Sequence, residues 1–269
     1  MWFYLQKIVE AFTGVGLWAL LLAQTFWATL KRPPAWSLVL DQLYNIGVLS
    51  LPVIAITGFS TGLVLAAQSF YQLADKGLAS ATGLLVGKEM LTEIGPALTA
   101  FMVIGRVGSS MTAVLGTMRV TEQIDALKSM AVNPNRYLSA PRVISCIAML
   151  PILTLFSALM GIFGGYLISV HVFGMSRQGY FDPMPVHITY FDIWTGMIKA
   201  LCFGFVISTI ACYKGITASG GAAGVGRATT NSVVICYSYI LILNFFLTMG
   251  LNVLHTLFVQ QFEKGVYNF

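Results

Sequence analysis

The fold is decided by one polar stretch, Met118-Arg-Val-Thr-Glu-Gln-Ile-Asp-Ala-Leu-Lys-Ser-Met-Ala-Val-Asn-Pro134. An apolar run lies on either side of it, Ile94 to Leu115 before it and Val143 to Val170 after it. Each run is long enough to cross a bilayer as a helix, which takes about 20 residues. Because charged side chains are costly in hydrocarbon, this stretch, which we call the island, is predicted to be a loop in water between two spans.

The island has the pattern of a short amphipathic helix. Its apolar residues recur at helical spacing and form a ridge: Val120, Ile124, Leu127 and Ala131. Its polar residues fall on the other side: Glu122, Asp125, Lys128 and Ser129. Thr121 is the predicted N-cap, and Asn133-Pro134 ends the helix because the residue before a proline disfavours the α conformation. A lone surface helix needs a partner for its ridge, so this one either lies on lipid headgroups or docks onto another protein.

Composition places the chain in the membrane. Hydrophobic residues make up 57% of the sequence, charged residues only 9%, and the mean hydropathy is +0.80. A soluble domain carries about a quarter charged residues. At about 20 to 25 residues per span plus loops, 269 residues allow five or six transmembrane helices. No length remains for a nucleotide-binding domain within this chain.

The basic residues predict which loops face the cytoplasm. The net charge of +5 is scattered along the chain rather than gathered into a patch that would suit nucleic acid. Two loops carry or adjoin several of the basic residues: Arg119, Lys128, Arg136, Arg142, Lys214 and Arg227. By the positive-inside rule, the island and the loop between Lys214 and Arg227 are cytoplasmic. The segments Tyr71–Thr92 and Gly174–Asp192 have more balanced charges and are predicted to lie outside.

Hydropathy predicts five spans, Gly47–Phe70, Ile94–Leu115, Pro141–Val170, Ile193–Tyr213 and Asn231–Phe258. Residues 1–34 are ambiguous, because 11–30 is apolar enough to span while a polar stripe precedes it. An interfacial helix, a sixth span and an uncleaved signal anchor all remain open on hydropathy alone. Five spans place the N-terminus inside and the C-terminus outside.

Three ionisable residues lie in or beside the spans. Glu93 precedes the helix-breaking pair Gly95-Pro96, and it is either a carboxylate at headgroup level or part of a lipid pathway. Arg106 is predicted to bind helix-end carbonyls or a carboxylate of the protein itself rather than its alternative partner, the substrate. Lys199 is predicted to snorkel outward. Small residues near Arg106 recur every three to four positions and predict a helix-packing or dimer surface: Gly105, Gly108, Thr112 and Gly116.

No catalytic or metal-binding pattern is found. The four cysteines fall in predicted spans without C-x-x-C spacing, and the histidines are isolated. The glycine-rich segment Gly215–Arg227 lacks the Gly-Lys-Ser/Thr of a phosphate-binding loop, so it is predicted to be a flexible connector. No metal or cofactor is therefore expected in this chain, and a membrane-embedded enzyme is disfavoured. A secondary transporter or channel for a hydrophobic or small solute remains the alternative, although such proteins usually carry midplane polar sites in repeated halves.

The island also carries a family resemblance. Arg119–Pro134 closely resembles the cytoplasmic coupling loop of MlaE-type permeases, the membrane subunits of MCE ABC transporters, which move phospholipid between membranes. Further stretches resemble the same family in the same order: Gln42–Ser50, Glu93–Pro96, Gly105–Ser109 and Gly226–Thr230.

The resemblance implies an all-α polytopic permease in a single domain, 1–269. This domain would comprise an N-terminal interfacial helix at 1–34, a five-span core at 47–258 and a cytoplasmic coupling helix at 119–134. It further implies a homodimer in the bacterial inner membrane, two separate ATPase subunits that bind ATP and Mg, and an outer MCE-domain protein. The implied function is to move phospholipid between the inner membrane and that carrier, for outer-membrane lipid homeostasis.

The same resemblance assigns roles to residues. The ATPase-coupling residues would be Glu122, Gln123, Ile124, Asp125 and Leu127. The segment Gly215–Arg227 would make a second contact with the ATPase instead of serving only as a connector. Glu93 would line an outward-open lipid cavity. In the family an arginine commonly precedes this glutamate, whereas here Thr92 takes its place, which weakens the inference that an Arg–Glu pair handles the headgroup.

Overall fold

The computed structural model describes residues 34–266 together with Gly16, Trp18 and Trp27, with side chains described up to Leu257. Helices and short connections make up all of this part of the chain, and it contains no strand. The interfacial helix predicted over residues 1–34 lies almost wholly outside the described residues.

Within the described part, five helical segments are long and apolar enough to cross a membrane. Each contains or closely overlaps one predicted span, so the prediction of five spans is confirmed. Their helices are α2 (Trp36–Ile46) with α3 (Leu51–Ala74), α5 (Ile94–Val103) with α6 (Ser109–Val120), α8 (Ala140–His171), α11 (Tyr190–Ile216) and α12 (Gly221–Val266).

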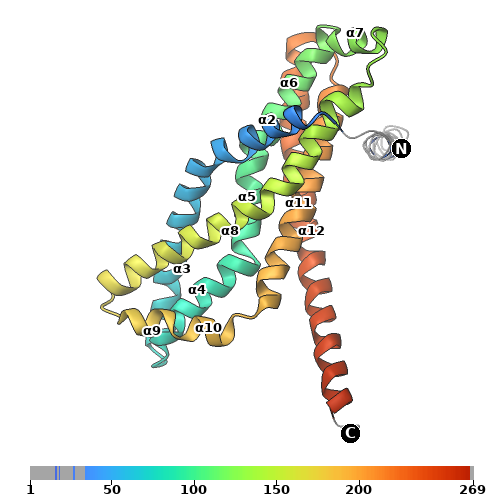
Figure 1. Ribbon diagram of the computed structural model, residues 1–269. Coiled ribbons are helices and arrows are strands. Elements are labelled where there is room, and N and C mark those ends of the chain that lie inside the picture. The colour runs from blue at the N-terminus through green and yellow to red at the C-terminus, as the bar shows by residue number, and fades with distance from the viewer. Residues whose placement is uncertain (1–15, 17, 19–26, 28–33, 267–269) are drawn as a thin grey trace, which may run out of the picture.

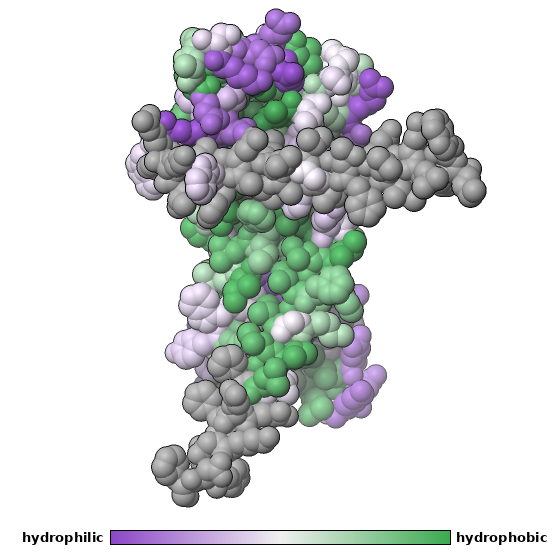
Figure 2. Space-filling model, turned by 90° about the vertical axis from the view of Figure 1, so that its right-hand side faces the viewer, coloured by the Kyte–Doolittle hydropathy of each residue, from purple (hydrophilic) through white to green (hydrophobic). Residues whose placement is uncertain are grey.

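The two ends of the bundle differ in character. The short helix α7 (Gln123–Ser129) lies at one end, and α9 (Arg177–Phe181) and α10 (Pro183–His187) lie near the other (Figure 1). Figure 2 shows hydrophilic residues gathered at the α7 end and an apolar surface below it. We call these the α7 end and the α10 end. The distribution fits a protein whose middle lies in lipid.

The core is centred on α11. In the most apolar window of this span 72% of the residues are buried, against 11% for α12. Phe203 and Ile207 of α11 pack against Ile104 and Leu150 from two other spans, and all four are fully buried. The helix α12 covers α6 and α11 with one face and exposes the rest of its surface.

Helices α3 and α8 approach until their backbones touch. A Cβ placed on Gly62 would lie 1.9 Å from the carbonyl oxygen of Gly161, and one on Gly164 would lie 2.4 Å from the carbonyl oxygen of Phe59. In lipid, where no hydrophobic effect drives helices together, such close approach supplies the packing energy. The contact holds these two spans at a fixed separation.

We expect Gly62→Ala to destabilise the protein, because the added methyl group has no space beside Gly161. Overpacking of this kind costs about 1–3 kcal/mol. Thermal unfolding of the purified protein in detergent should show a clearly lowered midpoint. The matched control is Gly250→Ala on α12, where a Cβ meets nothing within 4 Å. An unchanged midpoint for Gly62→Ala would contradict the close approach.

Two segments contain helix that the sequence does not predict. The outer segment Tyr71–Thr92 contains α4 (Thr82–Thr92), which packs against α8 with Val86 and Met90 fully buried. Its length of 11 residues is too short for a span, so hydropathy with a span-length window misses it. The helix folds back into the bundle from the α10 end.

The glycine-rich segment Gly215–Arg227 is the second of these, because most of it is helical. Only 217–220 connects α11 to α12, because helix α12 begins at Gly221. Gly220 and Gly221 have positive φ angles of 91° and 67°, which explains glycine at the turn itself. Val225 packs against α6, since a Cβ on Gly116 would lie 3.2 Å from it, whereas Ala222, Ala223 and Gly226 are exposed. Most of the segment therefore forms the first turns of α12 and is not a flexible connector.

Candidate functional site

Glu93 lies at the break between α4 and α5. It ends α4 and precedes the first residue of α5, and its backbone angles (φ −125°, ψ −66°) are not helical. The helix break predicted near Gly95-Pro96 is therefore present, two residues earlier. The break turns the Glu93 side chain toward α11 and α12.

Lys199 of α11 pairs with Glu93. Its Nζ donates a hydrogen bond to Oε1 of Glu93, and it also donates to the carbonyl oxygen of Thr92 at 3.0 Å and to Oγ1 of Thr248 at 2.8 Å. All three N–H groups of the ammonium therefore have an acceptor. The Lys199 side chain has no exposed surface, whereas that of Glu93 is 31% exposed.

The helix α12 completes this cluster. Thr248 Oγ1 lies 3.0 Å from Oε1 of Glu93, and Nδ2 of Asn244 donates to Oε2 at 3.3 Å. The amide oxygen of Asn244 is buried and has no partner among the described residues. The Glu93 carboxylate thus connects three spans. The same Asn244 amide that donates to this carboxylate has its own oxygen buried without a hydrogen-bond donor among the described residues. We call Glu93, Lys199, Asn244 and Thr248 the polar cluster.

The prediction that Lys199 snorkels outward is wrong. A lysine with a carboxylate partner within the protein does not need to reach the membrane surface. Thr92 stands where an arginine could have supplied a cation next to Glu93. Lys199 supplies that cation instead. Only weak signals in the sequence point to this arrangement. They are a lysine inside an apolar run and two polar residues, Asn244 and Thr248, four apart on one helix face.

Arg106 lies in a wide π-helical turn, η3 (Ile104–Gly108), between α5 and α6. Its Nη1 donates to the carbonyl oxygen of Asn45 at 3.1 Å and to Oγ of Ser50 at 2.6 Å. Because Asn45 lies in the last turn of α2, the prediction that Arg106 binds helix-end carbonyls is confirmed.

The small-residue surface of the second span packs within the chain. Gly108 faces Ile207 of α11, and Gly116 faces Ala218 and Val225. Thr112 is fully buried and lies within hydrogen-bond distance of Ser232 Oγ, at 3.0 Å. Gly105 is exposed. Three of the four residues thus serve packing inside the subunit, which leaves only Gly105 free for a contact with another chain.

The island forms a shorter helix than predicted. Helix α7 begins at Gln123, and Glu122 precedes it in the left-handed conformation with φ 59°. The prediction of Thr121 as N-cap is wrong, because Thr121 Oγ1 donates back to the carbonyl of Thr117 at 2.9 Å. A tight turn at Thr121 and Glu122 replaces the first helical turn.

The middle of the island's apolar ridge, Ile124 and Leu127, faces its own subunit, whereas Val120 and Ala131 at its two ends are exposed. Ile124 is 2% exposed and packs with Leu115, Leu138 and Cys212, while Leu127 packs against the edge of the same cluster. Ile124 therefore has no surface to offer another protein. The exposed residues at this end include Glu122, Gln123, Ala126, Ser129 and Met130.

Asp125 fixes α7 to the end of α6. Its carboxylate accepts from Arg119 Nη1 at 2.6 Å and from Lys128 Nζ at 2.9 Å. The hydrogen bond from Lys128, assisted by the charge of Arg119, lowers the pKa of Asp125 below its usual value. The carboxylate is therefore ionised at neutral pH, and the link between α6 and α7 is in place.

A groove of about 500 Å³ lies beside α7. Arg119, Ile124 and Lys128 line one side of it, and Ile216, Thr217 and Ser219 line the other. The connection between α11 and α12 thus lies next to the island, although 89 positions separate Lys128 from Thr217 in the sequence. The two loops that the basic residues mark form one surface.

The described residues contain no group of three or more His, Cys, Asp or Glu side chains that could hold a metal ion. All four cysteines are free thiols. The side chains of the polar cluster are joined by charge pairing and hydrogen bonds.

The sequence and this architecture agree with one known family. Residues 39–250 match the family described as Permease MlaE. The chain belongs to the MlaE permease family. This match covers three of the spans completely, most of the first and fifth spans, and both loops of the α7 end.

Among relatives of this MlaE permease, a probable ABC transporter permease protein of Rickettsia conorii is 42% identical over 222 residues, which are 82% of this chain and 86% of that protein. The intermembrane phospholipid transport system permease protein MlaE of Haemophilus influenzae is 32% identical over 247 residues, 90% of this chain and 94% of that protein. The chloroplastic protein TRIGALACTOSYLDIACYLGLYCEROL 1 of Arabidopsis thaliana is 36% identical over 219 residues, 81% of this chain and 63% of that protein.

Proposed function

We propose that this chain is the membrane subunit of an ABC transporter that moves phospholipid between the inner membrane and an MCE-domain carrier, in support of outer-membrane lipid homeostasis. The observation that carries the proposal is the similarity to the phospholipid permease of Haemophilus influenzae over 94% of that protein. The chain performs no bond chemistry in this proposal. A separate ATPase subunit binds ATP and Mg and hydrolyses the nucleotide.

The α7 end is the proposed cytoplasmic end, with the N-terminus inside and the C-terminus in the periplasm. The positive-inside rule supports this orientation, since Arg119, Lys128, Lys214 and Arg227 line the neighbouring cavities there. The ATPase contact is then the exposed part of the island, Glu122, Gln123 and Ala126, together with 217–219. Ile124, Asp125 and Leu127 act from behind this surface by fixing α7 to the bundle.

The polar cluster is the proposed headgroup end of the lipid pathway. Glu93 keeps 31% of its side chain exposed while Lys199 is wholly enclosed. A cation held behind a partly exposed carboxylate, with the unpaired amide oxygen of Asn244 beside it, can exchange partners when a zwitterionic or anionic headgroup arrives. The acyl chains need only apolar surface, which the spans provide.

A second copy of the chain is the proposed partner of α12. Only 11% of the most apolar window of this span is buried, and the exposed residues include Phe245, Phe246 and Tyr239. Two copies meeting through such surfaces would form a homodimer that encloses a lipid cavity. An MCE-domain protein would contact the α10 end.

Purification from the native membrane tests the function. We expect an ATPase subunit to co-purify with the full-length chain, and the complex to transfer fluorescent phospholipid between vesicles only when ATP and Mg are present. Transfer that proceeds without ATP and follows an ion gradient would instead establish the alternative, a secondary transporter. Recovery of the chain as an active transporter without an ATPase would also contradict the proposal.

A further inference from the structure

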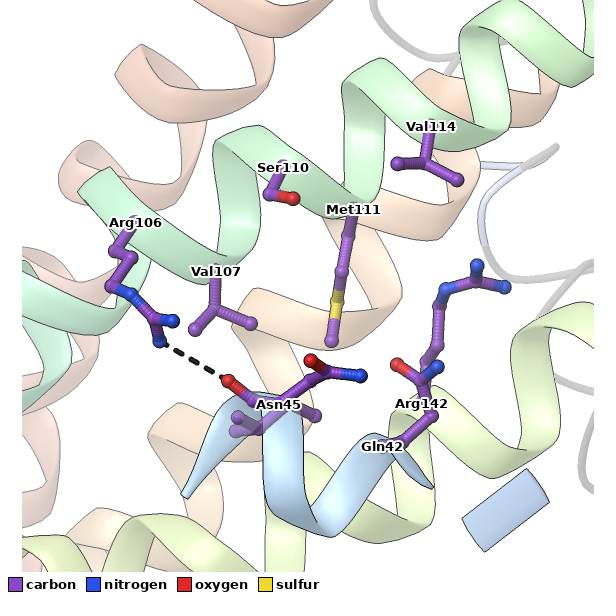
Figure 3. A pocket seen from close by; sticks show the side chains of 9 residues that line it. Gln42, Asn45, Arg106, Val107, Ser110, Met111, Val114 and Arg142 are labelled. Atoms are coloured by element: carbon purple, nitrogen blue, oxygen red, sulfur yellow. Dashed lines mark hydrogen bonds between the residues drawn. The ribbon is translucent and has the colours of Figure 1, made fainter. Parts of the chain in front are cut away.

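A polar cavity, separate from the groove beside α7, lies on the opposite side of the second span from the polar cluster. It has a volume of about 400 Å³ and lies between α2, the η3–α6 segment and the start of α8. Figure 3 shows Arg106 and Arg142 at opposite ends of this cavity, with Asn45 and Gln42 between them. Arg106 comes thirteen positions after Glu93, which is roughly 20 Å along a helix. No residue of the polar cluster lines this cavity.

The cavity carries two positive charges and no negative one. No aspartate or glutamate lines it, and within the described residues neither Arg106 nor Arg142 forms a salt bridge. Arg106 uses Nη1 for Asn45 and Ser50, and Arg142 uses Nη1 for the carbonyl oxygen of Leu138 at 2.7 Å. The other guanidinium nitrogens of both residues have no hydrogen-bond partner in the described part of the chain. A cation beside the hydrocarbon without a counterion is costly, and such a site suits an anion.

The rest of the cavity wall is apolar. Ile46, Val107 and Met111 are buried and form its floor, while Val114 at the mouth is 46% exposed. Asn45 and Ser110 at the mouth are also exposed, so the cavity opens to the molecular surface. Guanidinium groups bind phosphate oxygens in a forked geometry that lysine cannot match, and cavities of about 300–1,000 Å³ accept ligands of headgroup size. A phosphate with attached acyl chains fits both parts of this wall.

The backbone positions both arginines. Arg106 lies inside the π-turn η3, and Arg142 follows the second π-turn, η4 (Asn135–Ser139), by three residues. A π-turn inserts an extra residue into a helix, and such turns are rare and concentrated at functional sites. One π-turn thus carries one of the cavity's arginines, and the other π-turn lies three residues before the second arginine.

We infer that this cavity binds a phosphate ester anion, carried by the headgroup of a phospholipid in the leaflet nearer the α7 end. The inference rests on the proposed function, because it gives that permease a lipid position separate from the polar cluster. A lipid held between Arg106 and Arg142 would occupy the leaflet opposite to the one that the α10 end faces. The protein would thus hold lipid at two depths.

The test places a reporter at the mouth of the cavity. An environment-sensitive dye is attached to Ser110→Cys in the full-length chain with its four native cysteines replaced by alanine, in a non-ionic detergent. Three probes are titrated separately: phosphatidylglycerol, diacylglycerol with the same acyl chains, and inorganic phosphate. We expect a saturable response to phosphatidylglycerol alone. In Arg142→Gln the apparent affinity for phosphatidylglycerol should fall about tenfold, the effect of losing one charge-assisted hydrogen bond. In Arg177→Gln, the same change at an exposed position of the α10 end, the affinity should not change.

Each other outcome overturns the inference. An equal response to diacylglycerol would show a purely apolar cavity, and an equal response to inorganic phosphate would show a site for the free ion rather than for lipid. No response to any probe, or an unchanged affinity in Arg142→Gln, would remove the anion site. The selectivity among probes is measured on the unsubstituted arginines, so a folding defect in the variant does not affect it. The measurement uses no ATP and no transfer step, so its failure is distinguishable from failure of the proposed function.

Discussion

Lys199→Met is expected to reduce ATP-driven phospholipid transfer at least about tenfold. The substitution removes the cation from the polar cluster and leaves the Glu93 carboxylate without its ion-pair partner. Removing one partner of a buried pair costs about 3–5 kcal/mol, and the partial exposure of Glu93 lowers this to about 1–3 kcal/mol because water reaches the carboxylate. Reconstituted transfer and thermal unfolding are both measured, since a change in transfer alone would not separate the site from the fold.

The double variant Lys199→Met with Glu93→Leu distinguishes a transport role from a structural one. It removes both charges, so stability should recover relative to Lys199→Met while transfer should stay low. Glu93→Gln retains an acceptor for Lys199 and should reduce transfer only modestly, whereas Glu93→Leu strands a fully buried ammonium and should reduce it severely. If the double variant recovers transfer together with stability, the ion pair only holds α5, α11 and α12 together.

Ala126→Asp is expected to abolish recovery of the ATPase with the permease while leaving the permease folded. Ala126 is exposed on α7 in the isolated subunit, and an exposed substitution changes stability by only about half a kcal/mol. An unpaired charge in a protein contact costs about 2–5 kcal/mol, which is more than tenfold in affinity. The measurement is the amount of ATPase that co-purifies, with the thermal midpoint of the permease as the check on folding.

The matched control for this variant is Ala74→Asp, the same change at an exposed position near the α10 end. It should retain the ATPase at the wild-type level. Leu127→Asp is a poorer test, because Leu127 packs against the cluster of Leu115, Leu138 and Cys212 and the charge would disturb the fold. Wild-type recovery of the ATPase with Ala126→Asp would place the contact elsewhere on the α7 end.

The features that sequence predicts well are those set by solvent. The long apolar runs, and the charged island between two of them, reflect the transfer of whole segments into lipid. The five spans and the helical island therefore follow from composition and from the spacing of apolar residues. The break near Glu93 follows from local chemistry, since Gly95-Pro96 disfavours an uninterrupted helix. The contact of Arg106 with helix-end carbonyls is also predictable from the sequence, because a lone arginine in a span has few other acceptors.

Features that depend on the tertiary arrangement could not be predicted. Lys199 finds Glu93 across 106 positions of sequence, and no local pattern encodes that pairing. The ridge containing Ile124 has the same period whether it covers its own bundle or a partner, so amphipathicity cannot identify what it packs against. The glycines in 221–226 predict a loop, because glycine has a low helix propensity. In the structure this segment is helical, and its helix, α12, packs on α6. The role of Glu93 in transport stays a prediction.

The backbone contact between α3 and α8 also restricts how this sequence can evolve. Where a large side chain fills a gap, a second substitution can compensate for the first by trimming its neighbour. Gly62 and Gly161 are both already glycine, so neither partner has a side chain left to shorten. A suppressor of Gly62→Ala must therefore displace an entire span, and a selection for second-site revertants should return true reversions and few others.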